Sequence, residues 1–385
     1  MTASSSRSGR AWAHVGQPFT PPAPRPDGTH HDFIVIGAGR MGSVLTAALA
    51  AHAPATRLLL IEEGGLPNED GDTILAPGLW TTAHLPADRH AAAQASRALI
   101  ETFGAPTPRL HVSLHAHATP GSVPTRDALR DHPDTLALLD PARLPHATTD
   151  PHALTYRPGT LALNAAQAAV RAGADLLLNT RAVPQPGGAV RAERLTVTNT
   201  HQVVTHETHL LRARHVIVAG GAAGPALAEQ HLGVHTRHGR AYRQSPHLNV
   251  PSGPDSPTLH HAGLTLVPRH GAYTLHPRVH HRDPHGYRPT GGHLTGVPTG
   301  LRRETLEDLV ALMEDLPVLA TSQLHLGRSL ADIPGAWTAL PYGDPLHAPL
   351  FEALDPHVTL LLGGPHADTL GPQVAQALAQ QLAGR

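Results

Sequence analysis

Ten residues, 33–42 (FIVIGAGRMG), limit what this chain can fold into more than any others, because an apolar run leads directly into a Gly-x-Gly-x-x-Gly turn. Residues 43–51 then follow a helical pattern, and a second apolar run, 58–61, ends at Glu62. Strand, glycine turn, helix, strand and acid, in this order, are typical of a dinucleotide-binding βαβ unit. The sequence therefore predicts an α/β fold with a nucleotide groove at the start of its first helix.

The three glycines and the acid have separate physical roles in such a unit. Gly37 permits the tight turn, Gly39 lets the backbone approach a pyrophosphate, and Gly42 lets the helix pack close to the strand. The N–H groups and the dipole at the start of the helix attract phosphate. Glu62 follows the motif at the usual spacing of about 20 residues, where its carboxylate can accept hydrogen bonds from a ribose diol. A working cofactor site explains this set better than a vestigial nucleotide fold.

Composition narrows the chemistry that the chain can perform. It has 385 residues and a net charge of -1, which permits one or two cores and disfavours nucleic acid as the main partner. It contains no Cys, and all 29 of its Lys and Arg residues are Arg. These absences exclude a Schiff-base lysine, a thiolate nucleophile, cysteinyl iron–sulfur ligation and a cysteinyl flavin bond. A bound cofactor must therefore supply the difficult chemistry.

The 32 histidines do not form a clear metal-binding motif. Paired spacings occur at His115-x-His117 and His280-His281, but both lie in surroundings rich in Pro and Gly. The scatter follows the general richness of the chain in Ala, Pro, Thr, Arg and His, so surface histidine explains most of them. We predict no metal site.

Residues 1–31 are rich in Ser, Pro, Gly and Arg and have no periodic apolar pattern. This composition predicts a disordered N-terminal arm. No apolar core follows its basic residues as in a secretory signal, and no stretch of about 18 apolar residues could span a membrane. We therefore expect a cytoplasmic protein with no membrane span.

Helical and strand patterns alternate along the rest of the chain, with looser, Pro-rich segments between them. The patterns predict helices at residues 161–172, 304–313 and 372–383, and strands at 175–179, 191–198, 201–209, 215–219 and 359–362. The strands at 191–198 and 201–209 are expected to form a β-hairpin around Asn199-Thr200.

Two segments, 86–150 and 241–320, break this α/β pattern, because they contain many prolines and alternate polar with apolar residues as an antiparallel sheet does. They are predicted to form a substrate domain built on an antiparallel sheet. Residues 32–85, 151–240 and 321–385 are predicted to form a Rossmann-like domain with a parallel central sheet, discontinuous in sequence. The predicted fold class is thus α/β, as a two-domain α+β chain with a nucleotide-binding half.

Five blocks within residues 32–384 occur in the order found in one family. The blocks are the glycine turn with IEEG (61–64), GDTILAPGL (71–79), PGTL (158–161) with VIVAGGA (216–222), LVPRHG (266–271) with LGR (326–328), and GGPH (363–366) with LGP (370–372). On these motifs the chain resembles the D-amino-acid oxidase superfamily of FAD-dependent oxidoreductases, which includes glycine oxidase, sarcosine oxidase and D-amino-acid dehydrogenase.

The resemblance implies that FAD, held without a covalent bond, lies extended across the Rossmann-like domain. Its pyrophosphate would lie at residues 37–42, its ribose at Glu62, and its adenine near the backbone of Val183 or Ala182. The cofactor-binding residues so implied are Gly37, Ala38, Gly39, Arg40, Met41, Gly42, Glu62, Glu63, Thr73, Ala76, Gly78, Val183, Ala219, Gly220, Gly221, Gly364, His366 and Ala367. The carboxylate of Glu63 would repel a 2′-phosphate, which disfavours NADP in this groove.

The resemblance also implies a reaction, the removal of a hydride from a carbon that bears an amine or a hydroxyl, on a small substrate that carries a carboxylate. Arg328 is the first catalytic candidate, because an Arg fork fixes both the position and the angle of a carboxylate. His366 is the second, as a hydrogen-bond donor to the reduced flavin. The weaker candidates are Arg278, Arg288, Tyr242 and Tyr342.

Departures from the family pattern leave alternatives open. Ser329 follows Arg328 where relatives have Pro, Ala367 and Asp368 stand in the C-terminal loop, and 3% of the residues are aromatic. A carboxylate from Asp368 near the flavin would disfavour an anionic reduced ring. A non-catalytic flavin-binding subunit or pseudoenzyme is therefore an alternative to the oxidoreductase, and an NAD-dependent dehydrogenase is a third class. The sequence leaves the substrate's identity and chirality, the electron acceptor and the oligomeric state open.

Overall fold

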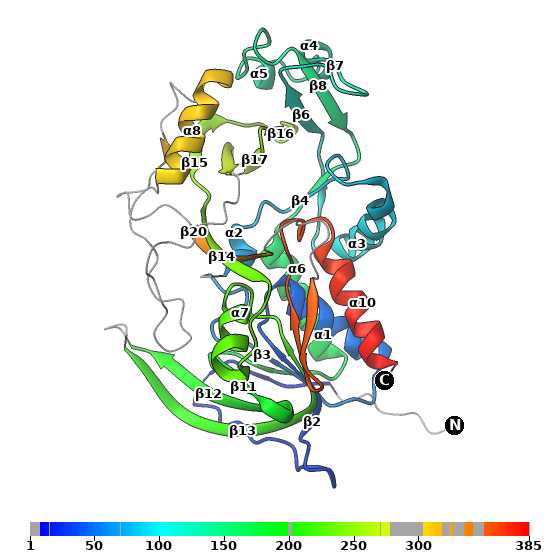
Figure 1. Ribbon diagram of the computed structural model, residues 1–385, viewed down its shortest axis with the longest axis vertical. Coiled ribbons are helices and arrows are strands. Elements are labelled where there is room, and N and C mark those ends of the chain that lie inside the picture. Colours follow the sequence, from blue (N-terminus) through cyan, green and yellow to red (C-terminus); the bar gives the residue numbers. More distant parts are fainter. Residues whose placement is uncertain are drawn as a thin grey trace.

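Two large sheets dominate the structure, which is a computed structural model (Figure 1). It describes residues 8–14, 16–69, 71–198, 202–269, 271–277, 303–317, 324–325, 335–341 and 350–384. A nine-stranded sheet forms the centre of one half, and an eight-stranded sheet forms the other. The predicted class, a Rossmann-like half joined to an antiparallel half, is confirmed.

Parallel strands form the middle of the nine-stranded sheet. In spatial order they are β1 (Ala11–Trp12), β10 (Asp175–Leu177), β3 (Leu58–Ile61), β2 (His31–Ile36), the end of β13 (Val203–Val218), and β22 (Val358–Leu361). Strands β3 and β22 are buried along their whole length, as strands covered on both faces are. The antiparallel β21 (Phe351–Asp355) pairs with β22 at the edge.

Strand β13 is 16 residues long and belongs to two parts of this sheet. Its first part pairs antiparallel with β12 (Ala189–Val197), which in turn pairs with β11 (Thr180–Gln185). Its last part runs parallel to β2. The predicted hairpin is confirmed by the β12–β13 ladder, although its turn, 199–201, lies outside the described residues.

The sequence predicted two strands, ending at His209 and beginning at His215, where the structure has β13 alone. The difference arises because the intervening residues continue the ladder: Leu211 lies opposite Val190, and Arg212 lies opposite Ala189. Two charged residues, Arg212 and Arg214, interrupted the apolar pattern and concealed this continuity in the sequence. The long strand carries the chain from the antiparallel edge into the parallel centre of the sheet.

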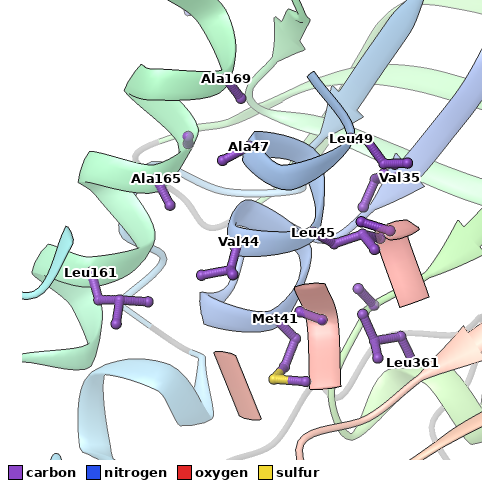
Figure 2. Close-up of a cluster of buried hydrophobic side chains, with 14 of the residues drawn as sticks. Val35, Met41, Val44, Leu45, Ala47, Leu49, Leu161, Ala165, Ala169 and Leu361 are labelled. Carbon is purple, nitrogen blue, oxygen red and sulfur yellow. The ribbon is translucent and has the colours of Figure 1, made fainter. Parts of the chain in front are cut away.

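Helices cover one face of the nine-stranded sheet. They are α1 (Arg40–His52), α3 (His90–Phe103), α6 (Pro158–Arg171) and α10 (Gly371–Ala383). Figure 2 shows α1 next to α6, with Val44 and Ala47 toward that helix and Leu45 and Leu49 on the opposite side. Small residues such as Ala165 let the two helices approach, and each buried Leu contributes about 1.5–3 kcal/mol. The predicted helices at 161–172 and 372–383 are confirmed as α6 and α10.

Apolar side chains from the chain before β2 pack on the opposite face of the sheet. Trp12 and Phe19 are buried in the core there, with ring centroids 5.1 Å apart. The prediction of a disordered arm over residues 1–31 is therefore wrong for 8–14 and 16–31, which the structure describes. Composition failed because a few well-spaced apolar side chains, rather than the average polarity, provide the buried contacts of this segment.

The eight-stranded sheet is almost entirely antiparallel. Its order is β19 (Leu324–His325), β15 (His247–Pro251), β18 (Ala272–His276), β17 (Leu264–Arg269), β16 (Thr258–His261), β6 (His111–His115), β8 (His146–Asp150) and β7 (Val123–Pro124), with β16 and β6 parallel. Leu259, Leu266 and Leu275 belong to a core cluster on one face, together with leucines of α8 (Arg303–Asp315). Helix α8 confirms the helix predicted at 304–313. His111 and His260 alternate with these core residues along their strands, so both histidines lie on the opposite face of the sheet.

Small elements connect the two halves. Between the large sheets lies a pair of antiparallel strands, β14 (His238–Gln244) and β20 (Gly335–Pro341) (Figure 1). A three-stranded sheet contains β4 (Leu79–Trp80), β9 (Leu154–Thr155) and β5 (Thr107–Pro108). The short helices are α2 (Asp72–Leu75), η1 (Ala87–Arg89), α4 (Thr125–Ala128), α5 (Pro133–Leu136), η2 (Pro186–Gly188), α7 (Ala223–Leu227) and η3 (Ala228–Leu232).

The sequence-based domain limits remain a prediction, and two elements bear on them. Helix α3 belongs to the predicted substrate segment 86–150, but its Ala93 and Ile100 join the core of the Rossmann-like half. Strand β19 belongs to the segment 321–385, but it pairs with β15 of the eight-stranded sheet. The chain thus crosses between the two halves at places that local patterns do not mark.

Candidate functional site

A cavity of about 1080 Å³ lies at the carboxyl ends of the parallel strands. Its lining includes the residues that directly follow β2, β3, β13 and β22. Ligands of open α/β sheets bind at this edge, and ligand sites usually span about 300–1,000 Å³, so the cavity is large enough for an extended dinucleotide. The structure thus places a groove where the glycine motif predicted one.

The lining brings together most of the residues assigned to the cofactor. Those that contribute to it are Gly37, Ala38, Gly39, Arg40, Met41, Glu62, Glu63, Thr73, Val183, Ala219, Gly220, Gly221, Gly364 and Ala367. The assigned residues outside the lining are Gly42, Ala76, Gly78 and His366. The wall also includes residues that the sequence did not suggest, among them Asn68, Asn179 and Trp337.

The glycine turn has the shape that a pyrophosphate requires. Gly37 has a φ of +101°, and a Cβ on it would lie 2.5 Å from the carbonyl oxygen of Ala219. A Cβ on Gly42 would lie 1.9 Å from the carbonyl oxygen of Gly37. Helix α1 begins directly after Gly39, and its first turn contains no acidic residue. The turn therefore presents backbone and a positive helix end to the cavity, which fits the phosphates of a dinucleotide.

Glu62 connects the glycine turn to the loop after β3. It is buried, and its Oε2 accepts a hydrogen bond of 2.6 Å from the N–H of Ala38. Its Oε1 accepts hydrogen bonds from Nδ2 of Asn68 at 2.8 Å and from the N–H of Gly64 at 3.2 Å. A carboxylate has about four lone-pair positions, so Glu62 can still accept a ribose hydroxyl. Its orientation into the groove fits the role that the motif assigned to it.

Glu63, unlike its neighbour Glu62, is not buried. Its side chain is 47% exposed, and its Oε1 lies 3.2 Å from Nε of Arg181. Arg181 also lines the cavity. The negative charge that the sequence placed at this end of the groove is therefore accompanied by a guanidinium.

A buried ion pair joins the start of α1 to the loop before α10. The guanidinium of Arg40 contacts Oδ1 of Asp368, and the hydroxyl of Tyr156 donates a hydrogen bond of 2.9 Å to the carbonyl oxygen of Asp368. Burial alone would lower the pKa of Arg40, but Asp368 and then Tyr156 and Asp72 raise it above its ordinary value. The carboxylate that the sequence suggested would disfavour an anionic flavin is thus neutralised by an adjacent cation.

Arg269 of β17 holds the loop that contains Ala76 and Gly78. Its Nη2 donates to the carbonyl oxygens of Ala76 at 3.2 Å and Pro77 at 2.7 Å. Burial lowers the pKa of Arg269. Gly78 has a φ of +60°, and a Cβ there would lie 2.1 Å from the carbonyl oxygen of Tyr156. The eight-stranded half of the molecule therefore fixes the loop that contains Ala76 and Gly78.

Strands β14 and β20 form an aromatic wall on the cavity. The rings of Tyr242 and Trp337 lie with centroids 5.2 Å apart, and both residues line the cavity. The guanidinium of Arg240 lies 5.7 Å from the centroid of the Trp337 ring, a distance at which cation–π attraction operates. The low aromatic content of the chain had not suggested such a wall. Tyr242, a weaker sequence candidate, takes part in it.

Asp72 fixes this wall against α2. Its Oδ1 accepts a hydrogen bond of 2.9 Å from Nη2 of Arg243, and its Oδ2 accepts one of 3.1 Å from Oγ1 of Thr338. Arg243 belongs to β14, and Thr338 belongs to β20. One carboxylate therefore ties both strands of the wall to the start of α2.

Only some of the catalytic candidates from the sequence lie among the described residues. His366 lies in the turn before α10, where its carbonyl oxygen accepts the N–H of Leu370 at 2.8 Å, and burial lowers the pKa of its side chain. Its neighbour Ala367 is on the cavity lining. The candidates outside the described residues are Arg328, Arg278, Arg288 and Tyr342, together with Ser329.

Three histidines lie close together at the polar face of the eight-stranded sheet: His111, which is buried, His260, which is half-buried, and His84 from the loop after β4. Nε2 of His84 is 3.2 Å from Nε2 of His111, and the rings of His84 and His260 have centroids 4.3 Å apart. Burial, followed by the charge of the neighbouring imidazoles, lowers the pKa of His111 and of His260 to about 3. In the part of the chain that the structure describes, no three His, Asp or Glu side chains are arranged to hold a metal ion. The prediction of no metal site remains a prediction.

Among the helices that the structure describes, none combines the length and the apolar character needed to cross a membrane.

Comparison with known proteins agrees with the geometry of the cavity. The family described as FAD dependent oxidoreductase (DAO) matches residues 32–381. The fold is similar to glycine oxidase from Geobacillus kaustophilus (TM-score 0.64, 16% identity, 92% of this chain and 95% of that chain). It is also similar to a glycerol-3-phosphate dehydrogenase from Bacillus halodurans complexed with FAD (0.64, 17%, 92% and 64%). A third similar structure is iminodiacetate oxidase from Chelativorans sp. BNC1 (0.62, 16%, 91% and 94%).

A sequence search of curated proteins found no match. The family match covers most of the chain and includes both the glycine turn and the loop before α10. The residues of the cavity fit the cofactor of that family, since the turn accommodates a pyrophosphate and Glu62 faces the groove. The chain belongs to the DAO family of FAD-dependent oxidoreductases, and FAD is its cofactor.

Proposed function

We propose that the protein oxidises the C–N bond of a small amino or imino acid. The carbon would give up a hydride and the nitrogen a proton, which would leave an imine that water can hydrolyse. When bound, FAD supplies the acceptor for the two electrons, and oxygen or another acceptor takes them up afterwards. A substrate with a C–OH group is the second class. Its carbon would give up a hydride and its oxygen a proton.

The observation that best supports this proposal is that one cavity extends from the glycine turn to the aromatic wall. The same cavity is lined by the glycine turn and by the Tyr242–Trp337 wall, between the two halves of the molecule. A substrate that enters beside this wall would meet the aromatic surface of Tyr242 and Trp337. Such an apolar surface suits the body of a small amine, because the rings exclude water from the reacting carbon.

Two of the structurally similar enzymes carry names that agree with this class, glycine oxidase and iminodiacetate oxidase. We propose Arg328 as the residue that binds the carboxylate, and His366 as a hydrogen-bond donor near the polar edge of the flavin. The roles of the chain itself would then be to orient the carbon bearing the hydride and to keep water from the site. The pairing of Asp368 with Arg40 supports an active enzyme over the non-catalytic alternative, because it removes the isolated charge.

Anaerobic reduction of the flavin tests the proposal. Oxygen-free protein is mixed with glycine, sarcosine, iminodiacetate, and the L- and D-forms of proline and alanine, while the flavin absorbance is followed. Bleaching by at least one of these substrates is expected, and lactate serves as a hydroxy-acid comparison. If dithionite bleaches the flavin but none of the amines does, the non-catalytic flavin-binding subunit becomes the better explanation.

A further inference from the structure

The first residues of the described chain form a feature that lies before the span shared with the family. We call residues 8–14 and 16–19 the N-terminal strap. Its strand β1 runs parallel to β10, which runs parallel to β3. In that register Trp12 lies opposite Leu177, and Leu177 lies opposite Ile61. The residues that follow the three strands therefore reach the same edge of the sheet, which is the ligand-binding edge.

Two residues of the N-terminal strap line the cofactor cavity. Ala13 and His14 contribute to the lining, together with Glu62 and Glu63 after β3 and Asn179 after β10. This is the end of the groove at which the ribose of adenosine is assigned to Glu62. The side chain of His14 is exposed rather than packed into the core, so it is available to a ligand. An imidazole ring can stack on a base or form a hydrogen bond with it.

Buried donors hold this part of the N-terminal strap in place. Arg194 has no exposed surface, and its guanidinium donates to the carbonyl oxygens of His14, at 2.7 Å from Nη2, and of Gln17 from Nη1. Asn179, which also lines the cavity, donates from Nδ2 to the carbonyl oxygen of Ala13 at 2.9 Å. Burial of a guanidinium is costly, and the two carbonyl oxygens offset part of that cost by accepting from Nη1 and Nη2, while Nε has no partner among the described residues. These contacts fix the backbone at Ala13 and His14.

We propose that the N-terminal strap closes the adenosine end of the FAD groove and that His14 contacts the adenosine of FAD. An edge strand that merely extended the sheet would need only the ladder between β1 and β10. Here, Asn179 and Arg194 instead donate hydrogen bonds to the two residues beyond the strand, where these residues line the cavity. The proposal rests on FAD as the ligand of this cavity.

The test measures FAD affinity in the full-length apoprotein. Flavin fluorescence gives the dissociation constant for the wild type, for His14→Ala and for His52→Ala, which removes an exposed histidine at the end of α1. Loss of one contact to adenosine should raise the constant about fivefold in His14→Ala and leave it unchanged in His52→Ala. A second variant, Arg194→Met, keeps the buried volume but removes both donors, and should raise the constant at least as much.

Hydrogen exchange supplies a readout that does not depend on these variants. FAD should slow amide exchange in the N-terminal strap of the wild-type protein. An unchanged dissociation constant in His14→Ala would overturn the contact with adenosine, and unchanged exchange in the strap on adding FAD would overturn the closure. If the wild-type apoprotein itself failed to bind FAD, the assignment of the cofactor to this cavity would fail first, which is a separate result.

Discussion

The guanidinium of Arg40 and the carboxylate of Asp368 form a buried ion pair between residues 328 positions apart in sequence. Arg40 begins α1, directly after the glycine turn, and Asp368 lies in the loop before α10. The pair therefore connects the phosphate-binding end of the groove to the loop that the family resemblance places beside the flavin. Neither charge can be changed without affecting both places.

Asp368→Ala should destabilise the protein strongly, because the guanidinium of Arg40 would remain buried without its carboxylate. Removing one partner of such a pair costs about 3–5 kcal/mol. Chemical denaturation of the variant should show this loss in the free energy of unfolding. Glu101→Ala is the control, since Glu101 pairs with Arg97 in an exposed helical i,i+4 pair worth about 0.3–0.5 kcal/mol. Equal effects of the two variants would contradict the structural role given to the buried pair.

Glu62→Ala should weaken the binding of FAD more than Glu63→Ala does. Glu62 faces the groove and fixes the N–H of Ala38, while the carboxylate of Glu63 pairs with Arg181. Loss of a buried, hydrogen-bonded carboxylate costs about 1–3 kcal/mol, or about 5- to 150-fold in the dissociation constant. Titration of the apoproteins with FAD gives both constants. Equal dissociation constants for FAD in the two variants would contradict the assignment of the ribose to Glu62.

The protein should purify with FAD bound non-covalently. The chain contains no Cys, so a cysteinyl bond to the flavin cannot form. Acid precipitation should release the yellow colour into the supernatant, where chromatography identifies FAD. Colour that stays in the pellet would indicate a histidyl bond instead, and His366 would then be the first residue to replace.

The glycine motif predicted β2, α1 and β3 because that part of the site is local in sequence. The wall of Tyr242 and Trp337 could not be predicted in this way, since the two residues come from segments nearly a hundred positions apart and meet only through the pairing of β14 with β20. The packing of the N-terminal segment was missed for a different reason. Trp12 and Phe19 are isolated in a polar stretch, and a composition average hides their burial.

Acid should destabilise the protein through two histidines of the eight-stranded sheet, His111 and His260. In the unfolded chain a histidine takes up a proton below about pH 6.5. Burial, and next the neighbouring imidazoles, lower the pKa of His111 and of His260 to about 3 in the folded protein, so the folded state stays unprotonated between these values. The unfolded state binds more protons there, and the free energy of unfolding therefore falls as the pH falls from about 6.5 toward 3.

Each such histidine can contribute a slope of up to about 1.4 kcal/mol per pH unit in that range. Urea denaturation at pH 7.5, 6.5, 5.5 and 5.0 measures it. His260→Gln replaces the imidazole with a side chain that does not titrate, so the slope should become shallower. His117→Gln, at an exposed position, should leave it unchanged. A slope that is the same in all three proteins would show that these imidazoles do not determine the acid sensitivity.

The last prediction concerns Arg328, which lies outside the described residues. If its guanidinium binds the carboxylate of the substrate, Arg328→Lys should damage flavin reduction nearly as much as Arg328→Ala. A lysine keeps the charge but lacks the planar fork that sets the angle of the carboxylate. A displacement of about 1 Å can already lower the rate about 100-fold. Rapid-mixing measurements of flavin reduction, at low concentration of a substrate found in the anaerobic screen, give the rates.

The spectrum of the oxidised flavin should stay unchanged in both variants, because the assigned cofactor contacts come from other residues. A solvated loop arginine would behave differently, since its replacement by Ala or Lys would leave the reduction rate close to that of the wild type. In that event the carboxylate site would move to Arg278 or Arg288, or the substrate would have no carboxylate.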